Sequence, residues 1–144
     1  MANATNYLEN KLVDHLFRAA TLAKPAALYV ALFTAAPSDA GGGTEVAGGG
    51  YARVNLPPLD TNWNATQGGT TGASSGTAGA TSNAAAVTFP VPSADWGTVT
   101  HFALFDAATA GNPLVWGALV AARDIVTGDP APTFPVGSLT ITVA

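Results

Sequence analysis

Residues 98–105 and 113–119 form the most constraining pattern in this sequence, because each run alternates its side chains as a β-strand does. A Gly-Asn-Pro sequence at residues 111–113 separates the runs and predicts a hairpin. In the first run one face carries Val99, His101, Ala103 and Phe105, and the other carries Thr98, Thr100, Phe102 and Leu104. Because both faces are largely apolar, the hairpin has to be covered on both sides. Trp96 and Trp116, each followed by glycine, are expected to be buried in the core that it forms.

Further strands are expected on both sides of this hairpin. Shorter strand-like runs lie at residues 27–33, 51–56, 84–89 and 124–126. The first of these has apolar side chains on both faces, which is typical of a strand in the centre of a sheet. Residues 138–143 alternate strictly, so Leu139, Ile141 and Val143 are expected to point inward.

One helix is expected at the N-terminus, over about residues 6–20. Asn6 can act as its N-cap, with Glu9 three residues later, and proline at position 25 follows its end. The predicted fold is therefore mainly β: an antiparallel sandwich or small barrel with one N-terminal α-helix and long Gly-rich loops. Residues 1–144 are expected to form a single domain, with the β-core at about residues 27–143.

Two loops are expected to be mobile in the free protein and to become ordered in contact with a partner. Residues 41–50 contain two Gly-Gly-Gly triplets, which give the backbone unusual freedom. Residues 60–83 read as a flexible insertion of Thr, Gly, Ser, Ala and Asn with one aromatic residue, Trp63. A loop with so few apolar groups cannot order itself by burial. Trp63 is accordingly interpreted as a contact residue, whether its partner is a protein or a sugar.

The composition favours a protein that packs against copies of itself. Only 10% of the residues are Asp, Glu, Lys or Arg, well below the roughly 25% of ordinary globular proteins. A surface made instead of Ala, Gly, Thr, Ser and Asn loses little side-chain entropy when a contact orders it. We therefore expect a homo-oligomer that also contacts other proteins.

Several partner classes are excluded at this stage. The net charge is −4 and the five basic residues are scattered, whereas nucleic-acid binding needs a basic patch. The chain has no cysteine, so a disulfide framework and thiolate metal sites are impossible. No apolar run approaches the length of a membrane span, and residues 1–10 lack the basic-then-apolar layout of a signal peptide, so membrane insertion is not expected.

No catalytic, cofactor-binding or metal-binding residue is predicted. Residues 72–76 match the G-x-S-x-G pattern, but Ser74 lacks the preceding strand and following helix that this nucleophile motif needs. His15 and His101 are the only histidines, and no set of ligands with metal-site spacing surrounds either of them. The glycine triplets lack the Lys-Ser/Thr of a phosphate-binding loop. We expect a protein that is not an enzyme.

Several segments together resemble, in order, a family of short bacteriophage structural proteins usually described as tail fibre proteins. These segments are Asn6-Tyr7-Leu8-Glu9-Asn10 with Asp14-His15, residues 28–33, Gly43-Thr44-Glu45-Val46, Gly49-Gly50-Tyr51-Ala52-Arg53, residues 85–90, and the hairpin from Trp96 to Trp116. The resemblance covers nearly the whole chain and implies a virion structural protein without enzymatic activity. The candidate assembly contacts are Trp63, Gly43, Glu45, Gly49, Tyr51 and Arg53.

The location on the particle is a separate question. A fibre shaft needs repeats or heptads, and this chain has neither. We therefore expect a capsid decoration or cement protein that binds the major capsid protein. The alternative is a tail fibre or tail accessory protein that contacts the host receptor, and an enzyme acting on the host envelope is a third class. In each case the protein is expected in the virion, after synthesis in the cytoplasm of the bacterial host.

Overall fold

The computed structural model describes residues 2–143, with 35% strand and 8% helix. In chain order the elements are β1 (Ala2–Ala4), α1 (Asn6–Phe17), β2 (Tyr29–Ala35), β3 (Thr44–Glu45), β4 (Val54–Asn55), β5 (Ala80–Ser82), β6 (Val87–Thr88), β7 (Gly97–Phe105), β8 (Pro113–Ile125), β9 (Thr133–Phe134) and β10 (Thr140–Thr142). The predicted mainly β fold with one N-terminal helix and antiparallel sheets is confirmed, and no barrel closes.

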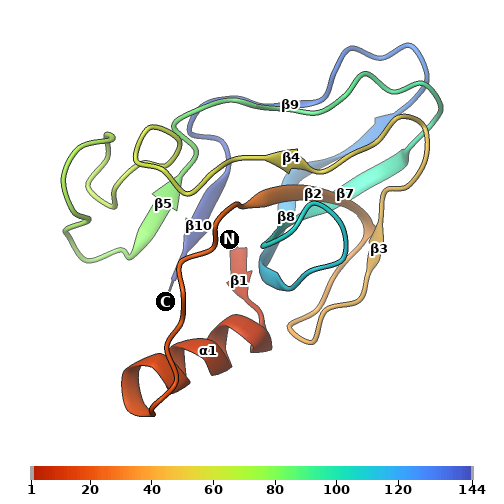
Figure 1. The fold of residues 1–144 in the computed structure, drawn as a ribbon. Coiled ribbons are helices and arrows are strands. Elements are labelled where there is room, and N and C mark those ends of the chain that lie inside the picture. The colour runs from red at the N-terminus through yellow and green to blue at the C-terminus, as the bar shows by residue number, and fades with distance from the viewer. Residues whose placement is uncertain (1, 144) are drawn as a thin grey trace.

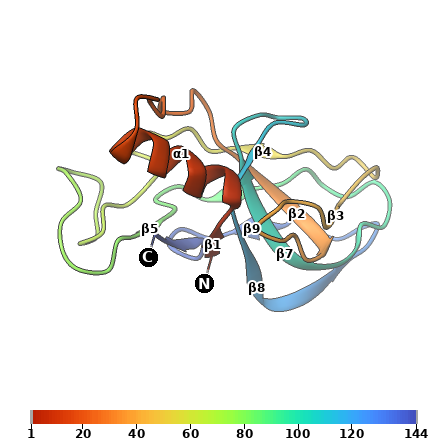
Figure 2. The ribbon, with the colours of Figure 1, turned by 90° about the horizontal axis from the view of Figure 1, so that it is seen from below.

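Six strands form the main sheet. Their order is β1-β8-β7-β2-β3, with β4 also paired to β2, and every pairing is antiparallel. Figure 1 shows β2, β7 and β8 crossing the middle of the molecule, and Figure 2 shows the marked curvature of β8. Strand β2 lies between β7 on one side and β3 and β4 on the other, as its two apolar faces predict.

The larger of two apolar clusters lies on one face of this sheet. Val30 and Leu32 of β2 belong to it, together with Phe89, Leu139 and Ile141 from segments outside the sheet. Two small two-stranded sheets, β5 with β10 and β6 with β9, organise those covering segments. The result is a sandwich-like core with one well-formed sheet and a second layer of largely extended chain.

The smaller cluster lies on the opposite face. It consists of Ala31 and Phe33 from β2 and Ala103 and Phe105 from β7, with Trp116 packed against it. The rings of Phe33 and Phe105 stack with their centroids 6.3 Å apart. The hairpin is therefore covered on both sides, as its sequence requires.

The alternation in β7 changes phase, which corrects one expectation. Val99 belongs to the larger cluster with Phe102 and Leu104, whereas strict alternation places it with Ala103 and Phe105. The register between β7 and β8 shifts between Val99 and His101. A bulge of this kind moves the following side chains to the other face.

The two tryptophans of the hairpin differ in burial. Trp96 is 5% exposed and its indole Nε1 donates to the Gly49 carbonyl at 2.8 Å, which confirms it as a core anchor. Trp116 is only half-buried, and its Nε1 donates to the Asp39 carboxylate at 3.0 Å. The expectation that Trp116 is buried in the core is wrong, because its ring lies beside the smaller cluster, where the cover is thinner.

The C-terminal part of the chain also departs from the prediction in two places. Strand β8 continues to Ile125, so the separate strand expected at residues 124–126 is its end. Leu139 and Ile141 are buried as predicted, but Val143 is 58% exposed. Val143 follows the last residue of β10, and its N–H pairs with the Gly79 carbonyl at the sheet edge.

Helix α1 is shorter than its sequence pattern indicates and ends at Phe17. Thr5, rather than Asn6, is the N-cap: its Oγ1 accepts the Leu8 N–H and donates to the Pro113 carbonyl at 2.6 Å. Arg18 is already extended, and no residue of α1 is buried. Without tertiary contacts to hold a further turn, the helix ends before residue 20.

The insertion at residues 60–83 carries more structure than expected. Gln67 bridges its two arms, donating to the Ala73 carbonyl and accepting the Ser75 N–H, at 3.0 and 2.8 Å. Its last residues form β5, which pairs with β10. The end of the insertion thus forms a strand, which its sequence did not indicate, whereas the turns around Gly68 have open space about them. The mobility of this segment in the free protein stays a prediction.

Asn83, at the end of this insertion, joins the two halves of the covering layer. Its side chain is fully buried and donates to the carbonyls of Ala85 and Pro135, both at 2.9 Å. Its Oδ1 accepts the Leu139 N–H at 2.8 Å, and its backbone pairs with Leu139 and Gly137. Nothing in the local sequence pattern marks this role.

Replacing Asn83 by Ala is expected to destabilise the fold by about 2–4 kcal/mol, because three side-chain hydrogen bonds are lost and buried backbone groups remain without partners. Urea unfolding followed by circular dichroism measures the change. Asn10→Ala, at an exposed helix position, serves as the control and should stay within about 0.5 kcal/mol of the unaltered protein. Equal stability of the two variants would contradict the role assigned to Asn83.

Candidate functional site

Three of the candidate contact residues, Glu45, Tyr51 and Arg53, converge in one hydrogen-bonded network. The Arg53 guanidinium donates to both carboxylate oxygens of Glu45, from Nε and Nη2, each at 2.8 Å. The Tyr51 hydroxyl donates to the same carboxylate at 3.0 Å. Fork-to-fork pairing of this kind is strong and geometrically specific.

Arg53 also fixes the connection between β7 and β8. Its Nη1 donates to the carbonyls of Ala107 and Ala110, at 2.9 and 2.8 Å, and its guanidinium carbon lies 3.6 Å from the centre of the Phe105 ring. The side chain is 7% exposed and that of Glu45 27%. Arg53 therefore covers the smaller cluster and uses its donors within the molecule.

Tyr51 connects this network to the larger cluster. Its hydroxyl accepts the Leu32 N–H at 3.0 Å, and its ring packs edge-on against Trp96 with centroids 5.3 Å apart. Burial raises the pKa of the Tyr51 hydroxyl above its usual range, because the phenolate would be poorly solvated there. Tyr51 therefore remains a neutral donor to Glu45 at physiological pH.

The two candidate glycines occupy positions where a side chain would not fit. A Cβ on Gly43 would lie 2.8 Å from the Ala35 carbonyl oxygen, and one on Gly49 would lie 2.9 Å from the Trp96 ring. Both also have positive φ, 78° and 55°, which glycine adopts without strain. They permit close packing of the chain on itself, and a contact with a partner at either position stays a prediction.

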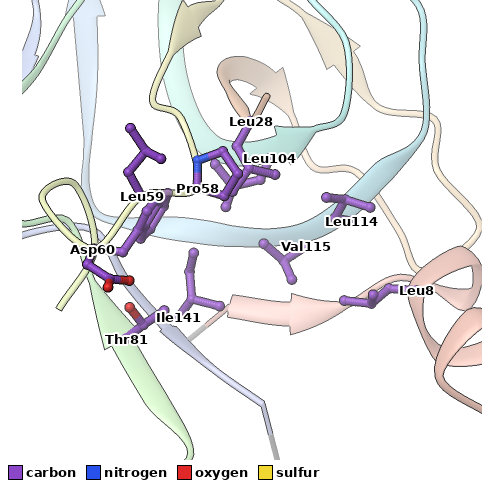
Figure 3. A pocket seen from close by; sticks show the side chains of 11 residues that line it. Leu8, Leu28, Pro58, Leu59, Asp60, Thr81, Leu104, Leu114, Val115 and Ile141 are labelled. Carbon is purple, nitrogen blue, oxygen red and sulfur yellow. The ribbon is translucent and has the colours of Figure 1, made fainter. Parts of the chain in front are cut away.

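Trp63 lies away from that network, beside an apolar cavity of about 320 Å³. Figure 3 shows the labelled Leu8, Leu114 and Val115 on one side of this cavity and Pro58 and Leu59 on another, with Asp60 and Thr81 at one end. Trp63 packs against the larger cluster and is half-buried. The residues next to Trp63 in the sequence are mostly polar or small and predicted an exposed side chain, whereas the structure buries part of it.

A second cavity of about 270 Å³ adjoins the first. Asp60, Trp63 and Thr81 line both cavities, and the walls of the second are mixed: they include the polar residues Asn64 and Ser74, whereas those of the first are almost entirely apolar. We call the two together the Trp63 cleft. The sequence pattern marks Trp63 but not Asp60 or Thr81, because only folding brings β5 beside residues 60–64.

An exposed apolar patch on α1 is a further candidate surface. Val13, Leu16 and Phe17 are 50, 67 and 80% exposed. Their spacings of three and four residues place them on adjacent parts of one helix face. We call these three residues the α1 patch.

The histidines have local partners. His15 Nδ1 accepts the Leu22 N–H at 3.2 Å, and His101 Nδ1 lies 2.8 Å from the Thr100 hydroxyl. Within residues 2–143 no group of three or more His, Asp or Glu could hold a metal ion. Over the same range no helix combines the length and apolar character needed to cross a membrane.

Replacing Glu45 by Ala should destabilise the protein by about 2–4 kcal/mol, since it leaves a buried guanidinium without its carboxylate. Asp14→Ala is the matched control, because Asp14 and Arg18 form an ion pair at 3.2 Å with side chains 39 and 72% exposed. Such surface pairs contribute roughly 0–1 kcal/mol. Thermal and urea unfolding measure both variants, and equal costs would show that the Glu45–Arg53 pair is not structurally important.

Comparison with known proteins gives one family. Among curated protein sequences none matches the chain significantly. The family described as "Podophage GP4 fiber I protein gp80" matches residues 3–142, which is nearly the entire chain. The matched range contains the strands that form the core of the main sheet and the residues that line the Trp63 cleft. A bacteriophage fibre family implies a place in the virion. The chain therefore belongs to the podophage GP4 fiber I protein gp80 family of bacteriophage fibre proteins.

Proposed function

We propose that this chain is a non-catalytic structural component of a podophage tail fibre, and that it assembles with other virion proteins, including further copies of itself, through the α1 patch. The observation that carries this proposal is that α1 contains no buried residue while three of its large apolar side chains are at least half exposed. Fully burying one such side chain contributes about 1.5–3 kcal/mol.

The length of α1 supports the same conclusion. Isolated helices shorter than about 12–15 residues are marginal in water, and most helices in proteins depend on packing of their apolar face. Helix α1 has 12 residues. Its attachment to the domain consists mainly of its N-terminal cap and the partly buried Leu8. A partner on the α1 patch would supply the packing that the domain itself does not.

The charges of α1 favour a second copy as one of its partners. The chain as a whole carries a net charge of −4. Residues 6–18, in contrast, contain two acidic residues, Glu9 and Asp14, and two basic ones, Lys11 and Arg18. Two copies of this helix can therefore approach without the repulsion that the acidic remainder of the surface produces.

The family match favours the fibre over the capsid decoration that the sequence pattern led us to expect. The absence of heptads and repeats excludes a long shaft, but a fibre also needs compact domains at its attachment points and ends. Separating heads from tails of purified particles tests this choice directly. The chain is expected in the tail fraction, and its recovery on tail-free heads would favour capsid decoration instead.

The variant Leu16→Ser/Phe17→Ser tests the α1 patch. We expect a folded protein with unchanged near-UV circular dichroism, a smaller mass in sedimentation equilibrium and reduced incorporation into virions, because apolar area is removed from the interface. Val91→Ser/Val120→Ser is the matched control, since these valines are 62 and 106% exposed and lie outside α1. Unchanged mass and incorporation in the first variant, or equal losses in both, would contradict the proposed interface.

A further inference from the structure

We propose that the Trp63 cleft binds a neutral saccharide that carries an apolar substituent, such as an N-acetyl or 6-deoxy methyl group. The inference concerns a surface apart from the α1 patch and does not depend on how the chain assembles. It rests on the polarity of the two cavities, on the charges that line them, and on the hydrogen bonding of Trp63.

The polar cavity offers hydrogen-bonding groups suited to sugar hydroxyls. Its lining residues include Thr70, Ser74, Thr81, Asp60 and Asn64. The Asn64 amide donates to the Ser82 hydroxyl, the Thr81 hydroxyl donates to the Asn64 carbonyl and the Ser74 hydroxyl accepts the Thr66 N–H, so the two hydroxyls keep acceptor capacity for a ligand. Among residues 2–143, Asp60 makes neither a side-chain hydrogen bond nor an ion pair. A free carboxylate beside an aromatic ring can accept from two adjacent hydroxyls of a ligand.

The charge of the cleft selects a neutral ligand. No Lys, Arg or His lines either cavity, and Asp60 lies where the two meet. An acidic sugar or a phosphate placed there would find no counter-charge and would be repelled by Asp60, although the solvent exposure of Asp60 weakens this repulsion. A neutral polyhydroxylated molecule incurs no such cost.

The apolar cavity selects the substituent. Apart from Asp60, Trp63 and Thr81, its lining consists of aliphatic and proline side chains, among them Pro58, Leu114 and Ile141. A hydroxyl buried there would lose its hydrogen bonds to water without replacement. A methyl or acetyl methyl group would instead gain from burial. A saccharide with hydroxyls on one side and such a group on the other matches both halves of the cleft.

The indole of Trp63, a residue that lines both cavities, lacks a hydrogen bond that such a group usually makes. Its Nε1 is buried and has no hydrogen-bond partner among the described residues, although buried indole N–H groups usually find an acceptor. A donor left in this state costs about 1–3 kcal/mol. Because this atom is buried, a ligand oxygen could pair with it only after the Trp63 side chain reorients, and the pairing would then contribute to binding.

The backbone around Trp63 is nevertheless well fixed. The Trp63 N–H donates to the Leu59 carbonyl, the Asn64 N–H to Ser82 and the Ala84 N–H to Asn62, at 2.7 to 3.1 Å. The Thr81 hydroxyl donates to the Asn64 carbonyl at 2.7 Å. One wall of the cleft is thus preorganised, which lowers the entropic cost of binding. The cavity volumes lie near the low end of the ~300–1,000 Å³ of small-molecule sites and fit a short saccharide.

The test uses the full chain labelled with ¹⁵N and follows its three indole N–H signals by NMR, since the protein has three tryptophans. Trp63→Phe, Trp96→Phe and Trp116→Phe assign the signals. The probes are N-acetylglucosamine and methyl rhamnoside, with glucose as the sugar lacking an apolar substituent. N-acetylneuraminic acid has the same acetyl group together with a carboxylate. We expect millimolar binding of the first two that shifts the Trp63 signal selectively, and at least about tenfold weaker binding of the other two.

Asp60→Ala should weaken binding of the preferred sugar by about tenfold or more, because hydrogen bonds to a charged acceptor are lost. Asp95→Ala, which changes an exposed aspartate outside the cleft, should leave it unchanged. Three results would overturn the proposal. The first is a Trp63 signal that neither preferred sugar shifts at a concentration about 20-fold above the expected millimolar dissociation constant. The others are N-acetylneuraminic acid binding as tightly as the preferred sugars, and unchanged binding in Asp60→Ala. The titration of the unaltered chain remains decisive even if a variant fails to fold.

Discussion

The apolar character of β2 and β7 on both faces is the constraint on which the rest of this structure depends. Val30 and Leu32 face one cluster, Ala31 and Phe33 the other, so the sheet needs two covers. One is assembled from short strands and extended segments pinned together by Asn83. The other is the loop between β7 and β8, held by the guanidinium of Arg53. Asn83 and Arg53 thus have the same structural role on opposite faces of the sheet.

The sequence predicted the parts of the fold that follow from side-chain alternation: β2, β7, the burial of Trp96, and the inward positions of Leu139 and Ile141. It could not predict the phase of Val99, since the shift arises from pairing with β8 and not from β7 itself. Strands of two or three residues, such as β3 and β5, are too short to leave a periodic pattern. The burial of Asn83 depends on partners more than fifty residues away.

For the candidate sites, the local sequence indicated which residues to consider, but not whether their side chains contact the protein interior or solvent. Glu45, Tyr51 and Arg53 were selected as candidate assembly contacts, and in the structure their polar groups bind one another and the backbone. Trp63 was selected as isolated, yet folding supplies it with apolar neighbours from the larger cluster. The exposure of Leu16 and Phe17 reverses the usual expectation for a helical apolar stripe. Such a reversal is what an interface separated from its partner would produce.

The pairing of distant strands also has a consequence for biosynthesis. Strand β1 is held by Val115 to Gly117, and β5 by β10 near the other end of the chain. The N-terminal strand and the middle insertion therefore have no partners until the last third of the polypeptide has left the ribosome. Folds dominated by such non-local contacts form slowly and leave apolar surface uncovered in the meantime. Until these pairings form, the edges of β8 and β10 and the apolar surface beside them stay open to contacts with other chains.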